Sequence, residues 1–158
     1  MTTYTSEAIP LTKNQGFTLL ELMVTVGILA VVSSIAVSSY SSFITTSQVQ
    51  TLNTNFESAA DVVQNNYAAA KQHVSMGASV ARYIPTNAQG WVDMLGSNDA
   101  RAPEGGSAYI IGAGDDITGA IGIGMTGSYG GRDSVVTIYR PAYRGVPATS
   151  ISFAQVDY

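Results

Sequence analysis

Hydrophobic residues follow three different patterns along the chain. Residues 1–16 are mostly polar and show no periodicity. The run from Phe17 to Val37 is then apolar over about 21 residues, and Glu21 is its only charged residue. A helix rises about 1.5 Å per residue, so this run would just span the roughly 30 Å hydrocarbon core of a bilayer. It therefore predicts a helix that lies either in a membrane or among other helices.

A helical stripe continues beyond this run, over residues 41–77. Its apolar positions recur at steps of three and four: Val49, Leu52, Phe56, Ala59, Val63, Tyr67, Ala70 and Val74. Proline is absent from Phe17 to Ile84, and Gly77 is expected to end the helix. We expect one helix of about 60 residues. A globular part would cover the stripe of its second half, and only lipid or other copies of the chain could cover its first half, residues 17–40.

The remaining residues, 78–158, predict short elements and an antiparallel sheet. A brief helix around Trp91–Leu95, capped by Thr86 or Asn87 and closed by Gly96, would bring Trp91 into the core. Turn-forming segments then separate four β-like runs, which are Ala108–Ile111, Ala120–Met125, Ser134–Arg140 and Thr149–Val156. Their hairpin-length connections predict a meander. The expected fold class is α+β, one long N-terminal helix packed on a four-stranded antiparallel sheet.

Composition excludes several kinds of chemistry. The chain has no cysteine, which excludes disulfides, thiolate metal sites and cysteine nucleophiles. Only 11% of residues are charged and the net charge is −4. Nucleic acid is not an expected partner because phosphate binding needs a clustered basic face, although Arg140 and Arg144 could form a local patch. With one histidine and no GxSxG, HExxH or Walker sequence, the chain shows no catalytic set, so we do not expect an enzyme.

Glu21 is the residue that most needs an explanation, because a carboxylate inside an apolar run costs a few kcal/mol in a membrane. A helix N-terminus would tolerate it there. Its surroundings point further: the sequence Gly16-Phe17-Thr18-Leu19-Leu20-Glu21-Leu22-Met23 resembles the prepilin processing signature of type IV pilins and type II secretion pseudopilins. The resemblance is strong from residue 16 to about residue 45. Beyond that it rests on the pilin-like layout of a long helix and a four-stranded sheet.

The resemblance implies a processing and assembly pathway. A membrane prepilin peptidase would remove residues 1–16 as a leader, cutting between Gly16 and Phe17, and would then N-methylate Phe17. The freed Phe17 amine of one subunit could pair with Glu21 of its neighbour, because a buried charge is costly unless it is paired. This pair would mainly set register, while apolar packing of residues 17–37 supplies cohesion.

Four features depart from the family pattern. Ser38 stands where many bacterial pilins have proline, and Ala30 stands where they often have glycine. The chain has Gly27 and the Ser33-Ser34 pair instead, so the resemblance does not carry over the local unwinding of this segment. The familiar C-terminal disulfide loop is absent, and the leader has Lys13 as its only basic residue.

Other readings of the N-terminus remain open. A conventional signal peptide would have its apolar core at Leu22–Val32 and its cleavage site near Ser34-Ile35-Ala36. An uncleaved anchor for a periplasmic binding or enzyme module is a further reading, in which Glu21 would be dispensable.

Several candidate sites lie in the C-terminal part. Residues Gly122 to Gly127 match the dinucleotide fingerprint, but no helix follows them, so we interpret the glycines as close approaches and turns in a sheet. Asp115 and Asp116, with Asp133, are weak candidates for a calcium site. His73 is expected on a solvated helix face. Exposed tyrosines could serve adhesion or subunit contacts, and the candidates are Tyr129, Tyr139, Tyr143 and Tyr158.

Taken with the resemblance, the sequence predicts a structural subunit of a type IV pilus. It would be held in the inner membrane as a precursor, with an assembly platform, and would polymerise with identical or homologous subunits into an extracellular helical filament. The alternative in the same family is a pseudopilin of a type II secretion system in a periplasmic pseudopilus. We expect no cofactor other than calcium.

Overall fold

A computed structural model describes residues 16–77, 83–97, 99–127 and 134–154. The chain forms two compact units, of which the first ends at Ser41 and the second begins at Ser42. We call the second unit the head.

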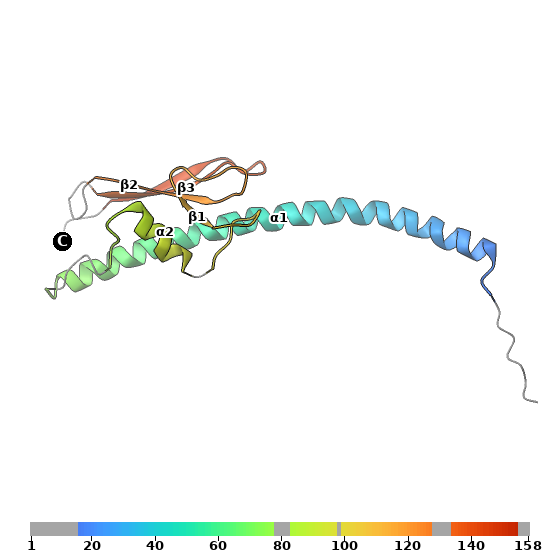
Figure 1. The fold of residues 1–158 in the computed structure, drawn as a ribbon, viewed down its shortest axis with the longest axis horizontal. Helices are drawn as coiled ribbons and strands as arrows, with labels where there is room; N and C mark the ends of the chain where they lie inside the picture. The colour runs from blue at the N-terminus through green and yellow to red at the C-terminus, as the bar shows by residue number, and fades with distance from the viewer. Residues whose placement is uncertain (1–15, 78–82, 98, 128–133, 155–158) are drawn as a thin grey trace, which may run out of the picture. The chain divides into compact units, whose positions relative to one another are not determined.

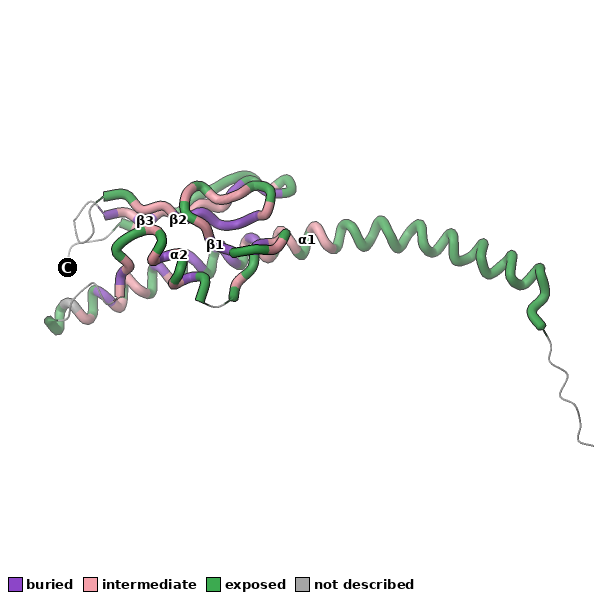
Figure 2. Tube along the Cα trace, viewed as in Figure 1, coloured by how far each residue is buried: buried purple, intermediate pink, exposed green. Residues whose placement is uncertain are grey.

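The predicted long helix is confirmed as α1, which spans Leu19–Val74 and has 56 residues. The residues of α1 up to Ser41 belong to the first unit, and its later residues belong to the head (Figure 1). The α1 residues before Ser41 are exposed, whereas five stripe residues in the head are buried, which are Leu52, Phe56, Ala59, Val63 and Ala70. Figure 2 shows this change of burial along α1.

The core of the head forms where the α1 stripe meets the other elements. Leu52, Ala59, Val63 and Ala70 are each 0% exposed. They share one hydrophobic cluster with residues of the sheet, which are Tyr109, Ile121, Ile123, Val136 and Ile138. The spacing of three and four therefore predicted the buried face of α1 correctly, because it places these side chains on one side of the helix.

A short second helix, α2, spans Ala88–Gly96. Asn87 caps it by accepting a hydrogen bond on Oδ1 from the Gly90 N–H at 2.8 Å. Trp91 is fully buried, as predicted, and lies edge-on to Tyr67 with ring centroids 6.0 Å apart. The helix therefore closes one side of the core with its single tryptophan.

The sheet has four strands in the order β1-β2-β3-β4. Their bounds are Tyr109–Ile111 for β1, Ile121–Thr126 for β2, Val135–Arg140 for β3 and Thr149–Ala154 for β4. The β2–β3 and β3–β4 pairs are antiparallel, with Ile138 opposite Ile123 and Ile151. The existence of four strands was predicted correctly, and the sheet is an α+β arrangement with α1.

The prediction of a fully antiparallel sheet was wrong, because β1 pairs with β2 in parallel. The connection after β1 does not form a hairpin. It turns at Gly112 and Gly114, which have φ values of 108° and 89°, and crosses so close to Gly122 that a Cβ there would lie 2.2 Å from the Gly112 carbonyl oxygen. A turn held by Asp115 then brings the chain back to begin β2 beside the beginning of β1.

The glycines from Gly122 to Gly127 therefore serve the sheet. Gly122 accommodates the crossing segment, and a Cβ on Gly124 would lie 2.9 Å from Cε2 of Tyr139. Gly122 and Gly124 lie in strand β2, which pairs antiparallel with β3, and Gly127 follows the strand. The interpretation of these glycines as close approaches is confirmed at Gly122 and Gly124.

Candidate assembly site at the start of the long helix

The first turn of α1 is organised by Thr18. Its Oγ1 accepts a hydrogen bond from the Glu21 N–H at 3.2 Å, and its carbonyl oxygen accepts one from the Leu22 N–H at 3.2 Å. Thr18 followed three residues later by Glu21 is the capping-box pattern. The sequence analysis missed this role of Thr18, although the spacing itself signals it. The cap fixes the helix start at Leu19. Gly16 and Phe17, which precede Thr18, therefore lie outside the helix.

Gly16 and Phe17 lie in accessible backbone ahead of this cap. Both are exposed, and Phe17 has 83% of its surface exposed. A Cβ added to Gly16 would meet no atom within 4 Å. Together with Thr18 and Glu21 they line a shallow depression of about 300 Å³. The three residues that the sequence analysis selected, Gly16, Phe17 and Glu21, thus lie together, and the bond between the first two is open to another molecule.

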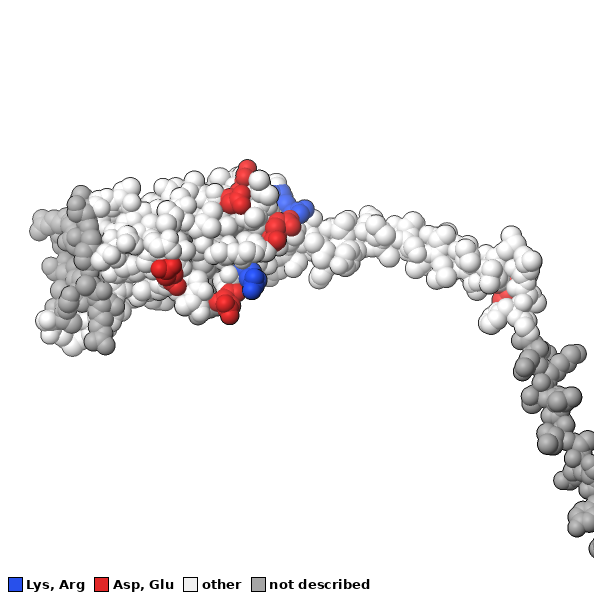
Figure 3. Space-filling view, in the orientation of Figure 1, with Lys and Arg blue, Asp and Glu red and all other residues white. Residues whose placement is uncertain are grey.

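Glu21 is a carboxylate that has no charged partner among the described residues. Across the described ranges of the chain it forms no ion pair, and it is the only charged residue between residues 16 and 41. In Figure 3 the face in view of α1 before residue 41 is otherwise uncharged. Its place in the first turn of α1 is favourable for an anion, because the helix dipole is positive there. A cation brought to this end would therefore find an unpaired acceptor.

The surface beyond Glu21 is apolar on all sides. Leu19, Met23, Ile28 and Val37 illustrate it, with 76%, 65%, 59% and 71% of their surfaces exposed. Within α1 an 18-residue window has a mean hydropathy of 2.3, and none of it is buried. By length and composition this helix can cross a membrane. A surface of this kind needs lipid or other protein to cover it, since large exposed apolar patches mark interaction sites.

Comparison with known proteins identifies the class of this site. Residues 11–37 match the family described as the prokaryotic N-terminal methylation motif, the prepilin-type signal of type IV pilins and pseudopilins. The chain therefore carries a prepilin-type signal, and the matched segment contains Gly16, Phe17 and Glu21. This signal implies processing by prepilin peptidase and assembly with other pilin subunits, and it points to a structural protein rather than an enzyme. Comparisons with curated proteins and with solved structures found no match.

The alternative interpretation, a conventional signal peptide, would have its cleavage site within the long helix. Ser34, Ile35 and Ala36 are inside α1, which continues without a break to Val74. The apolar helix with a prepilin-type signal fits a membrane-anchored precursor.

Asp115 and Asp116, the candidates for a calcium site, lie in the turn before β2. Asp115 is engaged in its own turn, where its carboxylate accepts hydrogen bonds from the Ile117 N–H at 3.0 Å and the Thr118 hydroxyl at 2.7 Å. These bonds lower the pKa of Asp115. No group of three or more potential metal ligands occurs in the ranges that the structure describes. Asp133 lies outside those ranges, so calcium binding stays a prediction.

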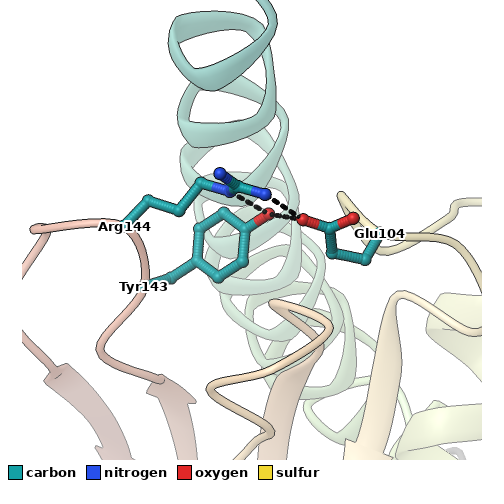
Figure 4. Close-up of polar contacts among 3 residues, drawn as sticks. All are labelled: Glu104, Tyr143 and Arg144. Carbon is teal, nitrogen blue, oxygen red and sulfur yellow. Dashed lines mark hydrogen bonds and ion pairs between the residues drawn. The ribbon is translucent and has the colours of Figure 1, made fainter. Parts of the chain in front are cut away.

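The head contains one polar cluster that the sequence analysis did not find. Tyr143 donates a hydrogen bond to Oε1 of Glu104 at 3.0 Å and accepts one from Nε of Arg144 at 3.1 Å, and Arg144 forms an ion pair with Glu104 (Figure 4). The Arg144 guanidinium and the Tyr143 hydroxyl hold the pKa of Glu104 below its usual value. Burial raises the pKa of Tyr143. The cluster ties two loops that are about 40 residues apart in the chain, so its function is structural.

The two arginines that the sequence suggests for a basic patch have different partners. Arg140 donates to Oδ1 of Asn53 at 2.8 Å and to the Pro147 carbonyl at 3.2 Å, whereas Arg144 binds Glu104. A basic patch at these two positions stays a prediction.

The remaining candidates divide between buried and accessible positions. Tyr143 is buried at 4% exposure, which contradicts an adhesive role, while Tyr139 is half-buried over Gly124. Tyr129 and Tyr158 lie outside the described residues. His73 is half-buried and stacks on Tyr83 with centroids 4.6 Å apart, so its helix face, expected to be solvated, is solvated only in part. The ring of Tyr83 covers one side of the His73 ring, and the helical pattern alone did not predict this contact.

Proposed function

We propose that this chain is the structural subunit of a type IV pilus filament, made as a precursor and assembled through α1. The observation that carries the proposal is the coincidence of a prepilin-type signal with an apolar helix surface that the chain itself leaves uncovered. Residues 1–16 are the leader in this proposal, residues 17–40 form the membrane and filament-core helix, and residues 78–158 complete the globular head on the stripe of residues 41–77.

Cleavage changes the electrostatics of the helix start. Hydrolysis of the Gly16–Phe17 bond leaves a carboxylate on the leader and an α-ammonium on Phe17, and N-methylation of Phe17 keeps that positive charge. The new charge lies just ahead of the positive end of the α1 dipole, which is unfavourable for a cation. A carboxylate must therefore neutralise it when the helix is taken out of water.

Glu21 supplies that carboxylate. It is one helical turn from Phe17 and has no charged partner within the described residues. In a filament, the Phe17 ammonium of an incoming subunit pairs with Glu21 of a subunit already in place. Because desolvation offsets most of the attraction in such a pair, the pair fixes the axial register more than it adds stability. Cohesion comes from burial of the apolar residues between Leu19 and Val37.

The second candidate is a pseudopilin, since the prepilin-type signal is common to both classes. The two candidates differ in where the mature protein is found. Fibres that can be sheared from the cell surface favour a pilus, and material that stays in the cell envelope favours a pseudopilus.

The first experiment is intact-mass and N-terminal peptide analysis of the protein from its native host. We expect a chain that begins at Phe17 and carries one added methyl group. A chain that begins near Val37 would identify a signal peptide, and a chain that retains Met1 would identify a plain anchor. Either of these results would contradict the proposal.

A further inference from the structure

The two edges of the sheet are protected very differently. On β1, the Ser107 hydroxyl accepts a hydrogen bond from the Tyr109 N–H at 3.4 Å and donates one to the Tyr109 carbonyl at 2.8 Å. This strand has only three residues, and α2 packs beside it. Short length, capping and cover are the usual ways in which proteins protect an edge strand.

The β4 edge has none of these protections within the described residues. It has six residues, Thr149–Ala154, with no charge and no proline, and five of the six are exposed. Its ladder to β3 and the bond between the hydroxyls of Ser152 and Thr137 are its only hydrogen bonds in the described part of the chain. The outward backbone groups of β4 are therefore available to another strand.

The hydrophobic core is also incomplete at this edge. Ile138 on β3 is 0% exposed, but Ile151, directly opposite it on β4, is 40% exposed. Phe153 lies two residues further along the same face and is half-buried. A strand added to β4 would therefore extend the ladder and at the same time cover apolar surface.

We propose that β4 pairs antiparallel with β4 of a second copy of this chain, with Ile151 opposite Ile151 of the other copy. A second copy fits because the strand is complementary to itself. In this register Thr149 lies opposite Phe153, and Ser150 lies opposite Ser152, so apolar side chains share one face and serines share the other. With no charged residue in β4, no like charges oppose each other across the two-fold axis.

This contact is distinct from the proposed filament core. Antiparallel pairing reverses the chain direction, whereas the subunits of one helical fibre share one direction. The β4 contact therefore joins free chains or subunits of separate fibres, and it would tie fibres side by side. It involves only head residues, so it does not depend on cleavage at Gly16 or on the pairing of Glu21.

The absence of cysteine makes the test direct. The full-length chain is purified in detergent as the single variants Ile151→Cys and Ser58→Cys, mildly oxidised and run on a non-reducing gel. Directly opposed residues have Cβ atoms about 4.5–5.5 Å apart, which is close enough for a disulfide after a small adjustment. We expect several-fold more covalent dimer for Ile151→Cys than for Ser58→Cys, which is an exposed position on α1 of the head.

A second pair of variants tests the register and does not alter the core. Ser150→Cys and Ser152→Cys chains are oxidised separately and as an equal mixture. We expect several-fold more dimer in the mixture, because position 150 of one copy lies opposite position 152 of the other. The proposal is wrong if Ile151→Cys forms no more dimer than Ser58→Cys, or if the mixture forms no more dimer than its components. Because this test uses the unprocessed chain, its failure would leave the proposed pilin function standing.

Discussion

Glu21 and Glu104 are both exposed carboxylates, but only Glu104 has a charged partner within the described residues. Glu104 is held by Arg144 and Tyr143 of its own chain and stabilises a loop contact. Glu21 lies alone on an apolar helix. Glu104 therefore contributes to folding, whereas Glu21 is the carboxylate to which the proposed function gives a role in assembly.

The Glu104 cluster predicts a specific pH dependence. The pKa of Glu104 in the folded state is below its ordinary value of 4.5, so the carboxylate contributes stability that is fully present above that value. This stability is lost as the pH falls through the lowered pKa. We expect the wild-type chain to be more stable than Glu104→Gln at neutral pH, and the difference to shrink progressively below pH 4.5.

Urea unfolding of both chains across this pH range measures the effect. Asp115 also has a lowered pKa, but it is present in both chains, so its contribution cancels in the difference. A difference that stays constant down to the acid limit would show that the carboxyl charge of Glu104 is irrelevant to stability.

Gly122 gives a second prediction at the scale of one residue. A Cβ there would lie 2.2 Å from a backbone oxygen, so Gly122→Ala forces the crossing segment away from β2 and should cost about 1–3 kcal/mol. Gly96→Ala is the matched control, because a Cβ at Gly96 meets no atom within 4 Å. Thermal unfolding of the two variants should show a lower midpoint for Gly122→Ala alone. Equal midpoints would contradict the close crossing.

Among the elements, α1 is a single helix with two different environments. Leu52 is 0% exposed in the head, and Leu29 is 63% exposed in the first unit. Leu52→Ala should therefore lower the free energy of unfolding of the head by about 2–5 kcal/mol. Leu29→Ala should change it by no more than about 0.5 kcal/mol.

Urea unfolding in detergent, followed by the fluorescence of Trp91, reports on the head for both variants. Trp91 is the only tryptophan and is fully buried in that unit, so the signal is specific. A large loss of stability in Leu29→Ala would mean that the exposed helix takes part in folding the head.

The bounds of the helices and strands could be predicted from the sequence to within about three residues, because each pattern has a direct physical cause. The steps of three and four placed Leu52 and Ala59 on one face. Asn87, one of the two predicted caps, marks the start of α2. The direction of β1 could not be predicted in this way. It depends on how Gly112 and Gly114 route the chain past Gly122, which is a contact between segments and leaves no local periodicity.

The assembly site was more predictable than the polar contacts of the head. Gly16, Phe17 and Glu21 lie within six consecutive residues, so their proximity follows from their short separation along the chain. Glu104 and Arg144 are 40 residues apart and meet only after the loops fold. Sequence reasoning finds such pairs only where a local motif brings the residues together.

At the scale of the whole molecule, the head has a buried hydrophobic core, whereas the described residues of the first unit are exposed. Glu21→Ala should therefore leave the head folded and the Gly16–Phe17 bond cleaved, but should abolish filament growth, because the Phe17 ammonium then has no partner. Glu57→Ala is the matched control, since Glu57 is an exposed glutamate on α1 of the head. Electron microscopy of sheared material measures fibre length, and mass spectrometry measures processing. Fibres of normal length in Glu21→Ala would contradict the role of this residue.

The hydroxyl groups on the first part of α1 have a mechanical consequence. Thr25 and Ser34 each donate to a carbonyl of the preceding turn, at 2.9 Å and 2.8 Å, so these donors are engaged by their own helix. Packed helices of this kind adhere mainly through dispersion forces, which have no preferred direction and re-form after sliding. We expect a bundle of such helices to lengthen under tension as its subunits slide past one another. The bundle should return to its original length when the tension is released.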